Sequence, residues 1–485
     1  MLFNSYDFLF GFLPMALLLH RLCLRLGVQA AMGFLVAVSL FFYGWWHPPY
    51  LALLLISMAF NYGLSRVTGD ASRPDVLRGR LTGLGVAANL LLLGWYKYAG
   101  FFAENLNAVV GWPAVVPQIA LPLAISFFTF QQISYLVDVR RGQAVSHRLL
   151  DYALFVTFFP QLVAGPIVHH REVFPQFAAG KGPQRLDLAV GLTIFIIGLG
   201  KKILLADPMS AWANEGFGIL AGGYALSPLD AWTALLAYTF QLYFDFSGYS
   251  DMAIGLGRMF GIKLPINFDA PLRAESMSDL WRRWHITLSR FLRDYLYIPL
   301  GGNRKGEARR FLNAFLTMFL GGIWHGAGWT YVAWGTLHGV FLMINHGWVA
   351  LFGPGSNSVL SRMSGRTLTF LAWIVALVSF RSRTIDDAFA MYQSLIGITP
   401  AEGYHLSGGA LRWVLLGFFI TQLLPTTQQW MRNYEPALGR MVDGRTGPSW
   451  LAWRPSVGWG VVLGAVFFFC VPFLDVAGQF IYWAF

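Results

Sequence analysis

One histidine in the sequence, His325, lies where it would be able to act on a substrate inside a membrane. It ends an apolar run that begins after Arg309 and Arg310. About 15 helical residues at about 1.5 Å each place it about 22 Å along a helix from that basic pair. A neutral imidazole has one acceptor nitrogen and can take a proton from a hydroxyl. The position therefore makes His325 a candidate general base, with a packing role in a helix bundle as the alternative.

The other histidines give weaker signals. His285 ends the motif WRRWH, and a histidine beside two tryptophans and two arginines is expected at a membrane interface. His338 and His346 are eight residues apart in one apolar segment, so they fall on nearly one helix face. No carboxylate accompanies them at helical spacing, and Cys23 and Cys470 lie in separate apolar stretches. We therefore predict no metal site.

Two carboxylates, Asp245 and Asp251, lie inside an apolar segment with the sequence YFDFSGYSD that starts at Tyr243. The small residues Ser247 and Gly248 would let helices approach closely there, so we expect these carboxylates to pair with nearby arginines or backbone donors. The sequence contains no GxSxG elbow, no phosphate-binding loop and no dinucleotide fingerprint. Hydrolase, ATPase and dehydrogenase functions therefore have no support.

The composition indicates which elements position these residues. Of 485 residues, 56% are hydrophobic and only 12% are charged, about half the charged share of a soluble domain. Apolar runs long enough to span a bilayer recur along the chain, which predicts an all-α polytopic membrane protein with about 10 to 12 spans. The net charge of +11 comes from short loops and helix ends, so we expect contacts with membrane lipid headgroups and none with nucleic acid.

Two segments depart from simple spanning helices within what we expect to be a single membrane domain, 1–485. The stretch 155–168 contains Pro160, Gly165 and Pro166 and is too short and broken to span, which predicts a re-entrant segment buried in protein. The stretch 270–310 interleaves basic and aromatic residues, as helices in the cytoplasmic interface do. Its basic end, like the basic loop after residue 140, is expected in the cytoplasm.

Five blocks stand out in order along the sequence: LPLAISFFTF at 121–130, FPQLVAGP at 159–166, QLYFDFSGYSD at 241–251, WRRWH at 281–285 and GGIWHG at 321–326. Together they resemble the membrane-bound O-acyltransferase family. The likeness runs through nearly the whole chain, and it is greatest to the bacterial branch of the alginate O-acetylation protein, the cellulose-acetylation proteins and the D-alanine transfer protein of teichoic acids.

The resemblance implies a ring of tilted helices around a thin centre, where an acyl donor meets an acceptor through a funnel and a tunnel. It matches His325 to the family's essential histidine and His285 to its second characteristic polar position, so both are candidate catalytic residues. The matched blocks also supply the candidate substrate-binding residues Trp324, Gln161, Tyr243, Asp245 and Asp251. Gln161 departs from the alginate-type members, which have histidine there, and this puts alginate itself in doubt as the substrate.

The function expected from this resemblance is a membrane O-acetyltransferase in the bacterial inner membrane. Acetyl-CoA would be the cytoplasmic donor, with no cofactor bound. The acetyl group would pass toward an extracytoplasmic polysaccharide, directly or through an extracytoplasmic acetyltransferase partner. Two alternatives stay open: an acyltransferase for lipids or proteins, and a transporter or channel that moves acetyl groups or polysaccharide without bond chemistry.

Overall fold

The chain folds into helices throughout the part that the structure describes. This computed structural model has no strand in that part, where the only β-type pairing is a single bridge between Pro265 and Leu438. The expected all-α fold class is thus confirmed. The description covers the whole chain except residues 46, 112–115, 117–118, 144–147, 180–181, 183, 354, 357, 401–402, 407, 440, 442–451, 476–479 and 482–485.

Several helices are suited to crossing a bilayer. Among the described residues, five are long and apolar enough: Asp7–Leu26, Pro48–Thr68, Asp75–Val110, Arg185–Ala221 and Val359–Arg381. Three shorter apolar helices cover Val28–Gly44, Ala410–Leu423 and Val457–Phe473. The protein is therefore a multi-pass membrane protein, and the number of about 10 to 12 spans stays a prediction.

The chain forms two compact units. Unit 1 comprises Met1–Ile196, Ser250–Pro265 and Tyr434–Gly439, and unit 2 comprises Ile197–Tyr249, Ile266–Asn433 and Arg440–Phe485. Helices α9 (Arg185–Gly200) and α11 (Pro228–Met259) contribute residues to both.

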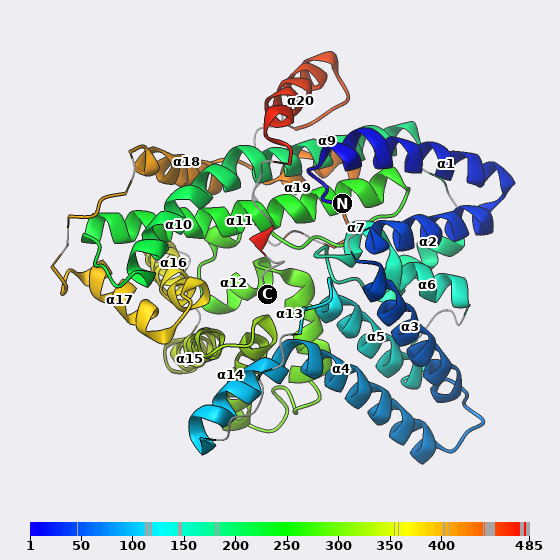
Figure 1. Cartoon of the computed structure of the whole chain (residues 1–485), viewed down its shortest axis with the longest axis horizontal. Helices are drawn as coiled ribbons and strands as arrows, with labels where there is room; N and C mark the ends of the chain where they lie inside the picture. Colours follow the sequence, from blue (N-terminus) through cyan, green and yellow to red (C-terminus); the bar gives the residue numbers. More distant parts are fainter. Residues whose placement is uncertain are drawn as a thin grey trace. The chain divides into compact units, whose positions relative to one another are not determined.

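Unit 1 is built from the N-terminal helices, among which α3, α4 and α5 lie side by side in Figure 1. Besides the short π-helix Asp7–Phe12, its helices are α1 (Leu13–Leu26), α2 (Val28–Gly44), α3 (Pro48–Thr68), α4 (Asp75–Val110), α5 (Ile125–Arg140), α6 (Leu149–Thr157), α7 (Phe159–Leu162) and α8 (His170–Ala179).

Buried amides hold the helices of unit 1 together. The Asn61 side chain of α3 donates to Gln132 Oε1 of α5 at 2.6 Å, and Asn89 Nδ2 of α4 donates to Asn61 Oδ1 at 2.6 Å. The Tyr152 hydroxyl of α6 donates to the same Gln132 oxygen at 3.2 Å. Hydrogen bonds of this kind contribute about 0.6 kcal/mol each between membrane helices. These hydrogen bonds fix the register of helices α3, α4, α5 and α6 relative to one another.

The broken stretch 155–168 consists of the end of α6, the single turn α7 and an extended segment, and all of its residues are buried. Gly165 is needed here, because a Cβ at this position would lie 2.5 Å from the Cα of Gln161. The backbone therefore does not continue as a regular helix through this buried stretch, and the re-entrant segment stays a prediction.

Unit 2 contains the chain's later helices. They are α10 (Asp207–Ala221), which follows the π-helical turn Lys201–Ala206, then α12 (Met277–Arg283), α13 (Ile286–Leu292), α14 (Glu307–His325), α15 (Trp329–Phe352), α16 (Val359–Arg381), α17 (Ile385–Ile396), α18 (Ala410–Leu423), α19 (Thr427–Trp430) and α20 (Val457–Cys470). The stretch 270–310 supplies only short helices, and residues 277–292 of it are largely buried.

Helices α14, α15 and α16 alternate in direction within unit 2, and Figure 1 shows α14 beside α15. Near the start of α14 the ring of Phe311 lies 6.2 Å from that of His346, which is near the end of α15. Near the other end of α14 the ring of His325 lies 5.3 Å from that of Phe380 at the end of α16. The bundle therefore has one end at the start of α14 and another at His325.

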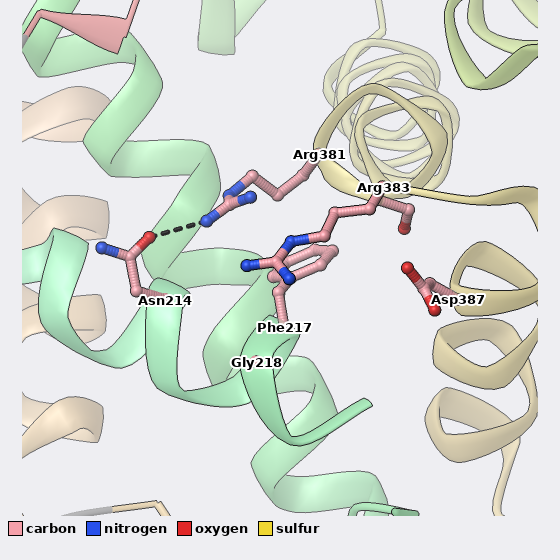
Figure 2. Close-up of a pocket in the computed structure, with 7 residues that line it drawn as sticks. Asn214, Phe217, Gly218, Arg381, Arg383 and Asp387 are labelled. Carbon is pink, nitrogen blue, oxygen red and sulfur yellow. Dashed lines mark hydrogen bonds between the residues drawn. The ribbon is translucent and has the colours of Figure 1, made fainter. Parts of the chain in front are cut away.

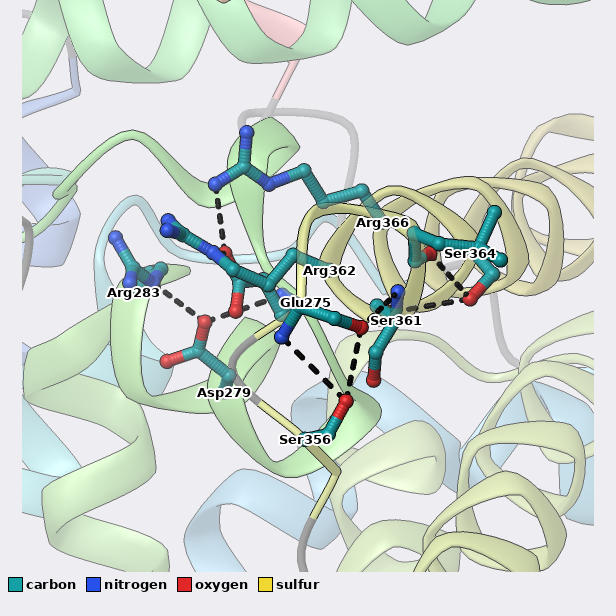
Figure 3. A network of polar contacts seen from close by, with 10 residues as sticks. Glu275, Asp279, Arg283, Ser356, Ser361, Arg362, Ser364 and Arg366 are labelled. Atoms are coloured by element: carbon teal, nitrogen blue, oxygen red, sulfur yellow. Dashed lines mark hydrogen bonds and ion pairs between the residues drawn. The ribbon is translucent and has the colours of Figure 1, made fainter.

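The end at the start of α14 is marked by a polar network (Figure 3). Glu275 accepts hydrogen bonds from Arg362 at 3.0 Å and from Arg366 at 2.6 Å, both in the first turns of α16. The nearby Ser278 hydroxyl lies 3.3 Å from the Nε2 atom of His346. This end gathers cations and carboxylates, and at the other end aromatic rings surround His325.

Candidate active site

Helix α14 ends at His325, and the backbone leaves the helical conformation at the next residue. Gly326 has an extended backbone, and a Cβ there would collide with the ring of Tyr331. The chain turns sharply at this glycine and starts α15 three residues later. His325 is thereby placed at the last position of one helix and against the first turns of the next.

Glycines bring α14 and α15 into close contact just before this turn. A Cβ at Gly322 would lie 2.6 Å from the Tyr331 carbonyl oxygen, and one at Gly335 would lie 2.7 Å from the Met318 carbonyl oxygen. Small residues at a helix interface allow such backbone approach in membrane proteins. The close packing sets the distance between His325 on α14 and the tryptophan ring of α15 described next.

His325 is enclosed by aromatic rings, with 4% of its surface exposed. Its ring is edge-on to Trp334 at 4.9 Å and to Phe380 at 5.3 Å, and it also contacts the ring of Trp324 at 4.9 Å. These rings keep water away and fix the plane of the imidazole. A buried imidazole held in one orientation is suited to accepting a proton from a single direction.

His285 occupies a strained position in unit 2. It precedes α13 with φ 42° and ψ 54°, a left-handed conformation that costs about 1 kcal/mol or more for a residue with a Cβ. Asn267 holds it: the His285 Nδ1 lies 3.1 Å from Asn267 Oδ1, which also accepts from the Thr287 hydroxyl at 2.9 Å. Since an amide oxygen only accepts, Nδ1 carries the proton and Nε2 is the acceptor nitrogen.

A continuous series of ring contacts joins the two candidate histidines. The centroid distances along it are His325–Trp334 4.9 Å, Trp334–His338 4.6 Å, His338–Trp373 5.4 Å, Trp373–Trp284 4.6 Å, Trp284–Phe268 5.0 Å, Phe268–Phe246 4.9 Å and Phe246–His285 4.7 Å. We call this series the aromatic array. It makes both histidines part of one buried structure within unit 2.

The middle of the aromatic array contains polar atoms that lack hydrogen-bond partners. Neither ring nitrogen of His338 has a partner among the described residues, and the same holds for the indole N–H groups of Trp281, Trp334 and Trp373. Trp281 joins this group through its ring contact of 5.2 Å with His338. Buried donors without partners are costly and usually indicate a water or a ligand. The sequence offered His338 only as a weak metal signal.

The other substrate-binding candidates of unit 2 lie in different surroundings. Tyr243 is buried, with its ring 6.5 Å from that of Trp284 in the aromatic array. Asp245 is buried in a charge cluster, where Lys202 Nζ lies 2.8 Å from Asp245 and 2.7 Å from Asp207. The backbone N–H of Ile481 also donates to Asp245 at 3.0 Å. The backbone donor was expected, but the cation is a lysine rather than an arginine, because the lysine-containing turn before α10 packs here.

Gln161 and Asp251 belong to unit 1, and both are buried. The Gln161 amide donates to the Phe155 carbonyl at 2.8 Å, which closes the broken segment across its turn. The roles of Gln161, Asp251, Tyr243, Asp245 and Trp324 in substrate binding stay predictions.

Sequence reasoning missed Asn267, Lys202 and the tryptophans around His338. Lys202 carries a visible signal, since two lysines interrupt an otherwise apolar run. Asn267 carries none, because its partner His285 is 18 residues away on the other side of α12, so the two residues share no helix or strand whose spacing could pair them. In the described part of the chain no group of three or more His, Cys, Asp or Glu residues is arranged to hold a metal ion.

The fold and the site define a class: a multi-pass helical membrane protein with a buried histidine in an aromatic setting. Comparison with known proteins makes this specific, because the profile of the membrane-bound O-acyltransferase family matches residues 115–378. The chain is 41% identical over 445 residues to the peptidoglycan O-acetyltransferase of Helicobacter pylori, covering 84% of this chain and 82% of that protein. It belongs to the membrane-bound O-acyltransferase family and is an acyltransferase.

Two further relatives place it within the family. It is 41% identical over 430 residues to the protein of Pseudomonas aeruginosa named probable alginate O-acetylase AlgI, covering 87% of this chain and 80% of that protein. It is 30% identical over 244 residues to the teichoic acid D-alanyltransferase of Streptococcus thermophilus, covering 47% of this chain and 57% of that protein. The resemblance to the bacterial O-acetylation branch is thus confirmed.

Proposed function

We propose that this protein transfers acetyl groups from cytoplasmic acetyl-CoA toward an extracytoplasmic polysaccharide, directly or through a partner transferase, in the bacterial inner membrane. The names of its two 41% identical relatives, an O-acetyltransferase of peptidoglycan and a probable O-acetylase of alginate, support the acetyl group and the polysaccharide. The observation that carries the mechanism is His325, which is buried among rings at the end of α14.

The arrangement of the α14–α16 bundle supports the direction of transfer. The end opposite to His325 contains the basic start of α14 and the arginines that bind Glu275. Excess Lys and Arg favour the cytoplasmic side of a membrane. His325 is 18 residues along α14 from Glu307, about 27 Å at 1.5 Å per residue. Acetyl-CoA would therefore enter from the basic end, and the acceptor hydroxyl would approach from the His325 end.

The proposed chemistry is a single acyl transfer. The acceptor hydroxyl gives its proton to the acceptor nitrogen of His325 while its oxygen attacks the thioester carbonyl carbon. The bond from that carbon to sulfur then breaks, and the protonated imidazole returns the proton to the leaving CoA sulfur. No metal and no bound cofactor takes part in this scheme.

The partnerless N–H groups in the aromatic array support a ligand between the two histidines. The ring of Trp334 contacts that of His325, and the ring of His338 contacts that of Trp334. The indole N–H of Trp334 and one nitrogen of His338 would serve as the hydrogen-bond donors that a developing oxyanion on the thioester carbon needs. His285, at the other end of the aromatic array, would orient the acyl donor, acetyl-CoA. Its fixed tautomer leaves Nε2 as a hydrogen-bond acceptor for an amide or hydroxyl.

The proposal is tested with inside-out membrane vesicles from producing cells, whose cytoplasmic face is open to added acetyl-CoA. We expect free CoA to appear in step with acetyl ester on the polysaccharide, and neither to appear in vesicles from cells that lack the protein. Entry of label without release of CoA would instead show a transporter. A preference for palmitoyl-CoA, with label in lipid or protein, would show the alternative acyltransferase.

A further inference from the structure

A buried ion cluster of unit 2 adjoins the aromatic array. Asp245 and Phe246 are consecutive residues of α11, and Phe246 is the ring of the array that contacts His285. Asp245 is 1% exposed, and its Oδ1 atom lies 2.8 Å from Lys202 Nζ. A charged pair at such depth is costly unless further hydrogen bonds satisfy it, so the remaining partners of these groups indicate what the pair does.

Glycines allow Lys202 to reach Asp245. A Cβ at Gly248 would lie 2.7 Å from the carbonyl oxygen of Gly198 and 3.2 Å from the backbone nitrogen of Lys202. Helix α11 therefore lies directly against the end of α9 and the π-helical turn that follows it. This close approach places the Lys202 Nζ atom between two carboxylates, with Asp207 as the second partner at 2.7 Å.

The second carboxylate of the cluster lies on a helix that is itself held in place. Asp207 is the first residue of α10, and Asn214 in the same helix accepts a hydrogen bond of 2.7 Å from Arg381 Nη2 at the end of α16 (Figure 2). The residue before this arginine, Phe380, contacts the ring of His325. Helix α10 is thereby attached to the bundle that contains His325, and the ion cluster has a defined position relative to it.

A distant part of the chain binds the other oxygen of Asp245. The backbone N–H of Ile481 donates to Asp245 Oδ2 at 3.0 Å, across 236 residues of sequence. Both carboxylate oxygens are therefore engaged by the protein itself. The ring of Phe480, which is 3% exposed, stacks on that of Tyr249 at 4.5 Å and lies 6.0 Å from that of Phe246. We call Phe480 and Ile481 the inserted pair.

The inserted pair packs against the ring that contacts His285. Besides Phe480, the ring of Phe246 contacts Phe268 at 4.9 Å and is edge-on to His285 at 4.7 Å. Truncation of Phe480 would leave Phe246 room to turn, because a packed interior closes such a cavity only in part. The imidazole of His285 would then keep its hydrogen bond to Asn267 and lose the contact that fixes its plane.

We propose that Phe480 is a positioning residue for the acyl transfer. Asp245 holds the inserted pair, whose ring fixes Phe246 against the imidazole of His285. The inference rests on the proposed function, in which His285 orients acetyl-CoA. Asp245 then serves the reaction without touching the substrate. An apolar side chain in its place would fill the space but would leave the backbone N–H of Ile481 without an acceptor, which is costly in a buried position.

The test is a double-mutant cycle in the inside-out vesicle assay, with the rate of acetyl transfer measured at saturating acetyl-CoA. We expect Phe480→Ala to lower this rate about 10-fold, because His285 no longer holds the donor in one orientation. In a His285→Gln background the same substitution should change the rate less than about 2-fold, because glutamine has no ring for Phe246 to fix. Phe473→Ala is the matched control, since Phe473 is an exposed phenylalanine shortly before the inserted pair, and it should leave the rate unchanged.

A second pair of variants tests the hydrogen bond without altering the ring. Ile481→Pro removes the N–H that donates to Asp245, whereas Ile481→Val keeps it. We expect Ile481→Pro to lower the rate as Phe480→Ala does, and to lose this effect in the His285→Gln background, while Ile481→Val transfers acetyl groups at the wild-type rate. If Phe480→Ala inserts poorly, Phe480→Leu replaces it in the cycle, because leucine fills much of the volume and has no ring.

The outcomes separate this inference from the proposed function. Equal fold losses from Phe480→Ala in the wild-type and His285→Gln backgrounds would show general damage to packing and would overturn the positioning role. A wild-type rate for a stable Phe480→Ala or Ile481→Pro protein would overturn it as well. Absence of acetyl transfer in wild-type vesicles would instead overturn the proposed function.

Discussion

At the scale of single residues, Glu275 shows how a local charge cluster stabilises the basic end of the bundle. Partial burial alone would raise the pKa of the Glu275 carboxyl, but the hydrogen bonds from Arg366 and Arg362 outweigh it and hold the pKa below its ordinary value. Glu275 lies outside the candidate membrane spans. Because this pKa is lowered in the folded state, the stabilisation is complete above the unfolded-state pKa of about 4.3 and is lost as pH falls through the folded-state pKa.

We expect Glu275→Gln to lower the thermal unfolding temperature of the purified protein at pH 7. The pair is partly exposed, so its contribution is at most about 1 kcal/mol. The difference between wild type and Glu275→Gln should shrink when unfolding is measured below pH 4.3. Glu104→Gln is the control, because Glu104 is exposed and has no ion pair in the described part of the chain. A difference that stays constant from pH 7 down to about pH 2, well below the unfolded-state pKa, would contradict the role of this carboxylate.

Candidate site residues could be predicted from the sequence where a polar side chain interrupts an apolar run. His325, His285, Asp245 and Asp251 stand out for that reason, and the structure buries all four. Their partners were not predictable, because a long-range pair such as Asp245 with Lys202 depends on how separate helices pack. No periodicity within one helix encodes that packing.

At the scale of elements, the site depends on how closely α14 approaches α15. Gly322→Ala adds a Cβ 2.6 Å from the Tyr331 carbonyl oxygen, which is backbone and cannot move aside cheaply. We expect the helices to separate, at a cost of about 1 to 3 kcal/mol, and His325 to shift away from Trp334. The unfolding temperature and the acetyl transfer rate should both fall.

Gly347→Ala is the matched control on α15. Nothing lies within 4 Å of a Cβ at that position, so only helix propensity changes and stability should hold or rise slightly. An unchanged unfolding temperature and full activity for Gly322→Ala would show that the close approach of the two helices is dispensable.

Element boundaries were partly predictable. Pro160, Gly165 and Pro166 correctly indicated that no continuous helix runs through 155–168, because proline and this glycine interrupt helical backbone. The buried part of 270–310 could not be anticipated from its amphipathic pattern. Interleaved cationic and aromatic residues give the same sequence pattern whether the aromatic side chains contact lipid or other helices. Trp281 and Trp284 are buried against other helices.

At the scale of the whole molecule, the account depends on the orientation of the chain in the membrane. Lys305 and Gly142 are exposed in basic loops expected in the cytoplasm, and Asp386 is exposed in the first turn of α17, just after the end of α16 that contacts His325. With Cys23 and Cys470 replaced, a membrane-impermeant maleimide added to intact cells should label Asp386→Cys and leave Lys305→Cys and Gly142→Cys unlabelled. Labelling of Lys305→Cys in intact cells would reverse the proposed direction of transfer.

The central claim is that His325 takes the proton of the acceptor hydroxyl, and one measurement addresses it directly: acetyl ester formation and CoA release by His325→Gln in the vesicle assay. Glutamine keeps a similar size and hydrogen-bonding capacity but accepts no proton at neutral pH. The account predicts a 10²- to 10⁴-fold loss of rate with wild-type yield and unfolding temperature, and a smaller loss for His285→Gln. A stable His325→Gln protein that transfers acetyl groups at the wild-type rate would contradict it.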